Sequence, residues 1–154
     1  MTSGETVLYF AYGSNMDPEQ MRERCPGADA AGQAALPGYR FLIKSRGVAT
    51  ITPSAGNQVL GVLWHVTPTH LETLDRYEGV RGGFYARSEV AVRTETRTVS
   101  ALVYIAADAT EGRPRPGYLK RLVAGAHLHG LPTKYIEQTL SAYAIPGPRS
   151  APET

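Results

Sequence analysis

The chain has 154 residues, 42% of them hydrophobic, and its formal net charge at pH 7 is +2. A chain of this length can bury about two thirds of its unfolded surface around one core, so a single domain is expected. No run of like charges marks a nucleic-acid-binding surface, and no stretch is long and apolar enough to cross a membrane, so neither partner is expected.

The first half of the chain alternates apolar segments with turn signals. A buried strand is predicted over 7–12, then a turn at Gly13-Ser14-Asn15, then a helix with Asp17 as N-cap and Pro18 at its first position. The helix should end near Cys25, the only cysteine, which excludes an internal disulfide and fits a reducing, cytoplasmic location. Further strands are predicted at 39–44, 48–52 and 59–66, with a turn at 54–57 between the last two.

The second half adds helices and a hairpin. Thr67-Pro68 predicts a helix start, and Gly79 its end just after Glu78. Strands follow at 84–92 and 98–106, a loop at 108–117, and helices at 118–129 and from 132 to about 143. About six strands and three or four helices predict an α+β domain over 6–145, with a mixed or mostly antiparallel sheet curled or closed into a small barrel. Residues 146–154 are expected to form a flexible tail.

Glu78 is the carboxylate whose position favours acid/base chemistry. It is expected at the C-terminus of a helix, where the helix dipole disfavours the ionised form by roughly 0.3–1 kcal/mol. Burial by its neighbours would raise its pKa further, toward the range in which a carboxyl group exchanges protons near neutral pH. A solvated helix end is the alternative interpretation of the same position.

The turn at Gly13-Ser14-Asn15 follows an apolar strand and opens a helix. Backbone N–H groups in such a turn suit a carboxylate or a developing oxyanion, although these residue types also occur in ordinary turns. Ser14 has no G-x-S-x-G context, which argues against a serine nucleophile. The histidines have no metal-ligand spacing, so no metal is expected, and no nucleotide-binding motif is present.

Several segments resemble the γ-glutamylcyclotransferase family, part of the AIG2-like superfamily. The opening segment Tyr9-Phe10-Ala11-Tyr12-Gly13-Ser14-Asn15 carries the resemblance most specifically. The segments 48–51, 61–64, 74–80 with Tyr85, and 125–132 follow in the family's order, so the resemblance covers about residues 7–143.

The resemblance implies a cofactor-independent acyl transfer within one molecule. The α-amine of a γ-glutamyl group attacks its own γ-carbonyl, which forms 5-oxoproline and releases the acylated amine. The family's catalytic glutamate falls on Glu78. Its substrate-binding residues fall on the loop Tyr9, Phe10, Ala11, Tyr12, Gly13, Ser14 and Asn15, and on Tyr85 and Tyr118.

The identity of the leaving amine stays open at this stage. Members of the family act on γ-glutamyl amino acids, on γ-glutamylamines, and on a γ-glutamyl-protected aminoglycoside intermediate in butirosin biosynthesis. The segments 81–83 and 111–117 are expected to shape that side of the site. Glu111 is their one acidic residue, so they do not offer the acidic lining that a strongly cationic leaving group would favour, and amino acids or small peptides are favoured instead. A binding module without activity is the alternative from another class, and a homodimer is one of the oligomeric states left open.

Overall fold

Five strands close a barrel within residues 6–144, the part of the chain that the computed structural model describes. The strands are β1 (Val7–Ala11), β2 (Asp29–Ile43), β3 (Ala49–Val66), β4 (Tyr85–Arg93) and β5 (Thr98–Ala106), and their order around the barrel is β1, β3, β2, β4, β5. Neighbouring strands are antiparallel except β1 and β5, which form a parallel pair through Tyr9 and Leu102. The prediction of an α+β domain with a mixed, closed sheet is therefore confirmed.

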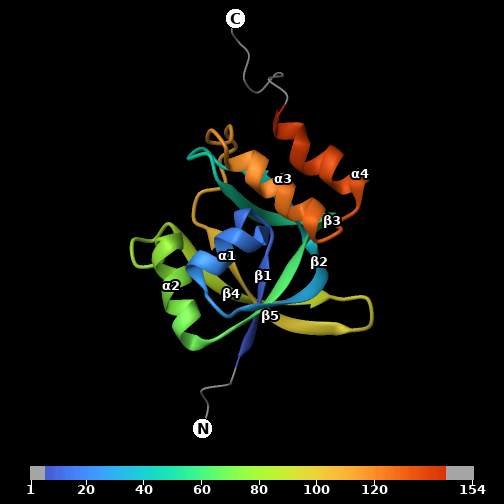
Figure 1. Ribbon diagram of the computed structural model, residues 1–154. Coiled ribbons are helices and arrows are strands. Elements are labelled where there is room, and N and C mark those ends of the chain that lie inside the picture. Colours follow the sequence, from blue (N-terminus) through green and yellow to red (C-terminus); the bar gives the residue numbers. More distant parts are fainter. Residues whose placement is uncertain (1–5, 145–154) are drawn as a thin grey trace, which may run out of the picture.

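Helices cover part of the barrel (Figure 1). They are η1 (Ser14–Met16), α1 (Pro18–Arg24), α2 (Pro68–Glu78), α3 (Tyr118–Leu128) and α4 (Thr133–Tyr135), which continues as the π-helical η2 (Ile136–Leu140) and the 3₁₀ η3 (Ser141–Ala144). In Figure 1, α1 and α2 lie on the same side of the barrel, whereas α3 and α4 lie together above it. None of the helices within residues 6–144 has the length and apolar character needed to span a membrane.

The expected helix boundaries agree with the structure. The Asp17 carboxylate accepts hydrogen bonds from the N–H groups of Glu19 and Gln20, as an N-cap does. Thr67 and His70 form a reciprocal capping box at the start of α2. Gly79 ends α2 in the left-handed conformation, with φ of 66°.

The prediction of three strands between 39 and 66 is wrong, and so the count is five rather than about six. Residues 49–66 form the single strand β3, paired with β2 along nearly its whole length. The predicted turn at 54–57 is instead a bulge, because Tyr39 pairs with Pro53 whereas Pro37 pairs with Gln58. Within it, Asn57 donates to the Ser54 hydroxyl at 2.6 Å, so the turn-forming residues close on themselves without ending the strand.

The core fills the barrel and the space beneath the helices. Its fully buried side chains come from several elements: Phe10 from β1, Leu63 from β3, Leu74 from α2 and Leu122 from α3. Cys25 is also fully buried, and burial raises the pKa of its thiol to about 11, as in a structural cysteine and unlike a reactive one. The predicted tail at 146–154 lies outside the described residues.

Candidate active site

A cavity of about 620 Å³ lies beside the C-terminal end of β1. Its walls come from β1, the turn after it, α1, the β2–β3 turn, the C-terminal end of α2, and the segment 115–121. The cavity brings together eight of the residues predicted from the sequence: Tyr9, Tyr12, Gly13, Ser14, Asn15, Glu78, Tyr85 and Tyr118. Phe10 and Ala11, also predicted, are 0% and 1% exposed in the core and do not line the cavity.

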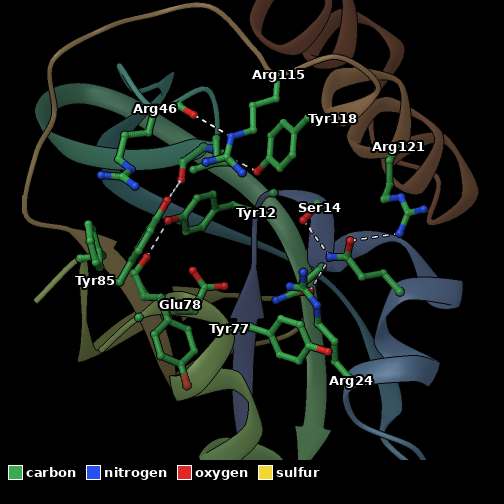
Figure 2. A pocket seen from close by; sticks show the side chains of 18 of the residues that line it. Tyr12, Ser14, Arg24, Arg46, Tyr77, Glu78, Tyr85, Arg115, Tyr118 and Arg121 are labelled. Atoms are coloured by element: carbon green, nitrogen blue, oxygen red, sulfur yellow. Dashed lines mark hydrogen bonds between the residues drawn. The ribbon is translucent and has the colours of Figure 1, made fainter. Parts of the chain in front are cut away.

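Glu78 enters this cavity from the last residue of α2 (Figure 2). Leu71 and Leu74 are buried on the same face of the helix as Glu78, about two turns and one turn earlier, so this face of α2 is held against the barrel. Burial raises the pKa of Glu78 from 4.5 to about 7, against the opposing effect of the positive charges of Arg24 and Lys44. The carboxyl group can therefore both accept and return a proton at neutral pH.

A hydrogen-bonded pair one turn earlier fixes α2 to the barrel. Asp75 accepts a hydrogen bond of 2.7 Å from the Tyr104 hydroxyl on β5. It also forms an ion pair with Arg87 on β4, with 3.1 Å between the charged groups. The Tyr104 ring in turn packs edge-on against Tyr9, with 5.7 Å between the ring centroids. These contacts position Glu78 relative to the β1 wall of the cavity, and the sequence patterns did not predict them.

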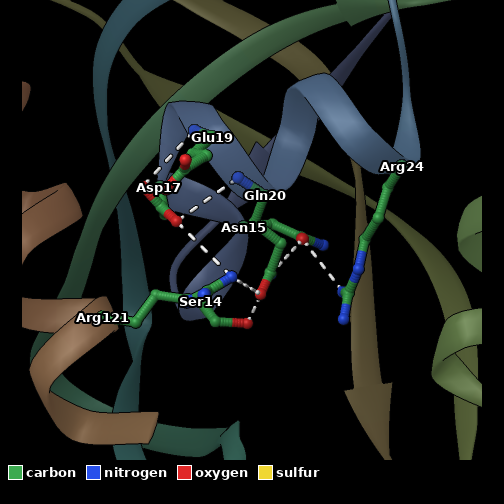
Figure 3. Close-up of polar contacts among 7 residues, drawn as sticks. All are labelled: Ser14, Asn15, Asp17, Glu19, Gln20, Arg24 and Arg121. Carbon is green, nitrogen blue, oxygen red and sulfur yellow. Dashed lines mark hydrogen bonds and ion pairs between the residues drawn. The ribbon is translucent and has the colours of Figure 1, made fainter. Parts of the chain in front are cut away.

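The turn after β1 is held by a network of side chains (Figure 3). Asn15 donates to the Tyr9 hydroxyl at 2.8 Å and accepts from Gln20 at 2.8 Å and from Arg24 at 3.1 Å. The Ser14 hydroxyl accepts a second hydrogen bond from Gln20, at 2.8 Å. These bonds fix one conformation of the turn, which is the condition for its backbone N–H groups to stabilise charge in a transition state.

Two tyrosine hydroxyls clamp the backbone of Ala49, the first residue of β3. Tyr85 donates to the Ala49 carbonyl at 2.6 Å, and the Ala49 N–H donates to the Tyr118 hydroxyl at 3.0 Å. Burial raises the pKa of both phenols, so they stay protonated at neutral pH. Both tyrosines thus build the cavity wall opposite Gly13. A Cβ added to Gly13 would lie only 3.0 Å from the Tyr118 hydroxyl oxygen.

Four arginines line the cavity: Arg24, Arg46, Arg115 and Arg121. The sequence analysis named none of them as a site residue, although Arg115 lies in the segment 111–117 that was expected to shape the leaving-group side. Two stack on exposed aromatic rings, Arg24 at 4.1 Å from the centroid of Tyr77 and Arg46 at 4.6 Å from that of Phe84. Glu78 is the one carboxylate among the lining residues that the structure describes. The cavity therefore has a positively charged surround, which suits a substrate with carboxylate groups.

The other candidate chemistries gain nothing from the structure. No group of three potential metal ligands occurs within residues 6–144. His70 is part of the helix cap, and no histidine from the described part of the chain lines the cavity beside Ser14.

Comparisons with known proteins agree on one family. A model of the AIG2-like family matches residues 58–139. The chain is 35% identical to the γ-glutamylcyclotransferase of Mus musculus over 88% of this chain and 78% of the mouse protein. It is 34% identical to the γ-glutamylcyclotransferase of Homo sapiens over 87% and 77% of the respective chains. A solved structure of a γ-glutamyl cyclotransferase superposes with a TM-score of 0.85 at 32% identity, over 97% of this chain and 94% of that one.

Proposed function

Because the chain belongs to the γ-glutamylcyclotransferase family, we propose that it converts the γ-glutamyl group of a small-molecule substrate to 5-oxoproline and releases the acylated amine. The observation that carries this proposal is Glu78, whose pKa is raised to about 7 in the same cavity as the Gly13–Asn15 turn. An acid/base group and a turn of backbone donors are the two components that such an acyl transfer needs.

Glu78 moves the protons in this mechanism. Its ionised carboxylate takes a proton from the α-ammonium of the glutamyl group, and the freed amine attacks the γ-carbonyl carbon. A C–N bond forms to close the five-membered ring, and the carbonyl π electrons move to the oxygen. The protonated Glu78 then gives its proton to the departing nitrogen as the original amide bond breaks. The ring nitrogen still carries one proton more than the neutral lactam, and the regenerated carboxylate takes it and passes it to the released amine, which leaves as an ammonium.

The turn after β1 stabilises the oxyanion that forms between these two steps. Backbone N–H groups of Gly13 to Asn15 donate to it, and the absence of a side chain at Gly13 lets the γ-carbonyl approach closely. The cavity walls built by Tyr85, Tyr118 and Tyr9 hold the glutamyl chain bent for attack on itself. Orientation supplies much of the rate because amine and carbonyl belong to one molecule.

Incubation with γ-glutamylalanine tests the proposal, with 5-oxoproline and alanine measured by mass. Glu78→Gln should lower kcat/KM at least 100-fold, the usual size of a lost acid/base group. The matched control is Glu72→Gln, an exposed residue of the same helix, which should retain wild-type turnover. Release of free glutamate in place of 5-oxoproline would identify a hydrolase.

The pH dependence offers an independent check on Glu78. The base must be ionised, and its pKa in the free protein is about 7, so kcat/KM should rise as the pH increases through about 7. A profile already level at pH 5 would assign the base to another group.

The enzyme is further proposed to work in a reducing, cytoplasmic environment, in line with a single buried cysteine, Cys25. The homodimer stays a prediction, which light scattering at several protein concentrations would test.

A further inference from the structure

Arg46 and Arg115 form a basic end of the cavity, separate from the turn after β1. Arg46 lies in the turn between β2 and β3, and Arg115 in the loop before α3. Figure 2 shows this pair together on one side of the cavity and Arg24 with Arg121 on the other. The two pairs are held in different ways, and the difference indicates what each can bind.

The protein itself fixes the basic end in place. Arg115 donates from Nε to the Arg46 carbonyl at 2.9 Å, and its backbone N–H donates to Gly47 at 3.0 Å. Its aliphatic chain packs over Gly47, where an added Cβ would lie 2.6 Å from the Arg115 Cγ. The Arg46 guanidinium rests on the ring of Phe84. Both guanidinium groups are therefore placed at the cavity by backbone and ring contacts.

Within residues 6–144, no ion pair joins a carboxylate to Arg46 or Arg115. The ion pairs in this part of the chain join Arg87 to Asp75 and Arg121 to Asp17. Lys44 adds a third positive charge beside them, with its ammonium 5.2 Å from the Tyr85 ring and the residue only 2% exposed. Burial lowers the pKa of Lys44, and the positive charges of Arg46 and Arg115 lower it further.

The opposite pair is already engaged in the structure. Arg24 donates to Asn15, and Arg121 donates to the Gln20 side chain at 3.1 Å, so these arginines support the turn after β1. In the proposed reaction that turn holds the γ-glutamyl group. The unpaired guanidinium groups then face the part of the substrate that leaves.

We propose that Arg46 and Arg115 determine specificity by binding carboxylate groups of the leaving amine, so that the enzyme prefers leaving amino acids in the order of their negative charge. This inference rests on the proposed cyclisation. An acidic amino acid such as aspartate, with two carboxylates, fits the paired guanidiniums best, a neutral amino acid with one carboxylate comes second, and an amine without a carboxylate is the poorest substrate. Planar guanidinium groups with several donors are suited to such carboxylate binding.

Two pairs of isosteric substrates measure this preference. γ-Glutamylaspartate and γ-glutamylasparagine differ by one charge at nearly constant size, and γ-glutamylalanine and γ-glutamylisopropylamine differ by the α-carboxylate. In each pair, the substrate with the additional carboxylate should have a kcat/KM at least about tenfold higher, which is the usual gain from a hydrogen bond to a charged group. The ratio should shrink as salt rises from 0.05 to about 1 M, because exposed charges are screened.

Variants locate the preference in the arginine pair. Arg46→Gln/Arg115→Gln should reduce both ratios to near one, whereas Arg115→Lys, which keeps the charge, should retain most of the aspartate preference. Arg81→Gln is the matched control: the segment 81–83, which the sequence led us to expect at the leaving-group side, does not line the cavity, and Arg81 is exposed.

The outcomes separate this inference from the proposed function. Equal kcat/KM values within each pair, or ratios unchanged in the double variant, would overturn the role of Arg46 and Arg115 while 5-oxoproline formation continued. Absence of 5-oxoproline from all four substrates would overturn the proposed cyclisation itself.

Discussion

Gly13 shows how closely the cavity walls approach the turn after β1. Its φ of −117° is not in the left-handed region that favours glycine, so it is the space around the residue that favours glycine there. An added Cβ would lie 3.0 Å from the Tyr118 hydroxyl and 3.3 Å from the Ala49 Cβ. The added methyl group must therefore displace either the turn or the wall that Tyr118 and Ala49 form.

We expect Gly13→Ala to lower kcat/KM by roughly 100-fold, because loss of one oxyanion donor costs about 3 kcal/mol. The midpoint of thermal unfolding should change by only a few degrees, because the turn lies at the cavity and outside the core. Steady-state kinetics and thermal melts measure both effects.

Tyr118→Phe supplies the internal control for this steric explanation. The substitution removes the oxygen that the new methyl group meets, so the loss caused by Gly13→Ala should be smaller in the Tyr118→Phe background than in the wild type. Additive losses in the double variant would mean that Tyr118 is not the obstacle.

At the level of elements, the C-terminal end of α2 determines where the Glu78 carboxyl group lies. Gly79 adopts the left-handed conformation, and an added Cβ there would lie 2.9 Å from the Phe84 ring. Gly79→Ala should therefore disturb the end of the helix twice, through backbone strain and through contact with Phe84. We expect a loss of about 1 kcal/mol or more in the free energy of unfolding, with a fall in kcat of at least tenfold.

Gly56→Ala is the matched control for the Gly79 substitution. Gly56 has a similar positive φ of 85°, but nothing lies within 4 Å of the position that its Cβ would take. Urea unfolding should show backbone strain in both variants, whereas assays should show a loss of kcat only for Gly79→Ala. Equal activity in the two variants would show that the end of α2 tolerates the displacement.

Elements defined by local signals were predictable from the sequence, and those defined by distant pairing were not. Asp17, Thr67 and Gly79 mark helix ends through contacts a few residues away, and the structure has those ends where expected. Residues 29–38 of β2 carry no strand signal of their own, since most are small or polar and exposed. They form a strand because β3 pairs with them, and no local pattern contains that information.

The same distinction applies to the residues of the cavity. Glu78 and the turn after β1 stand in recognisable segments, and the structure brings them into one cavity. Arg24, Arg46, Arg115 and Arg121 belong to four separate segments, each of which resembles ordinary charged surface. Their convergence depends on the closed barrel, so the sequence alone did not predict the basic surround.

For the molecule as a whole, burial of the Glu78 carboxyl group lowers the free energy of unfolding near neutral pH. Its pKa rises from 4.5 to about 7 on folding, so its favourable contribution is complete below about pH 4.5 and is lost as the pH rises through about 7. The shift corresponds to roughly 3 kcal/mol at most.

Glu78→Gln removes this titration from the folded protein. The difference in the free energy of unfolding between the variant and the wild type should grow by roughly 2–3 kcal/mol in favour of the variant as the pH rises from 4.5 to 8. Urea unfolding of both proteins across that range measures the gain, and Glu72→Gln should show none of it. If the free energy of unfolding of the two proteins changed with pH in the same way, the pKa of Glu78 would lie at its ordinary value.

Strand β1 joins the closure of the barrel to the candidate active site. It pairs with β5 only through Tyr9 and Leu102, and its C-terminal end leads directly into the turn at Gly13. Opening of this seam would therefore also release the turn. Bound 5-oxoproline must dissociate before β1 can separate from β5. At a 5-oxoproline concentration 100 times its dissociation constant, this separation should therefore be about 100-fold less frequent. Amide hydrogen exchange near Leu102, a residue outside the cavity, would then report occupancy of the site by 5-oxoproline.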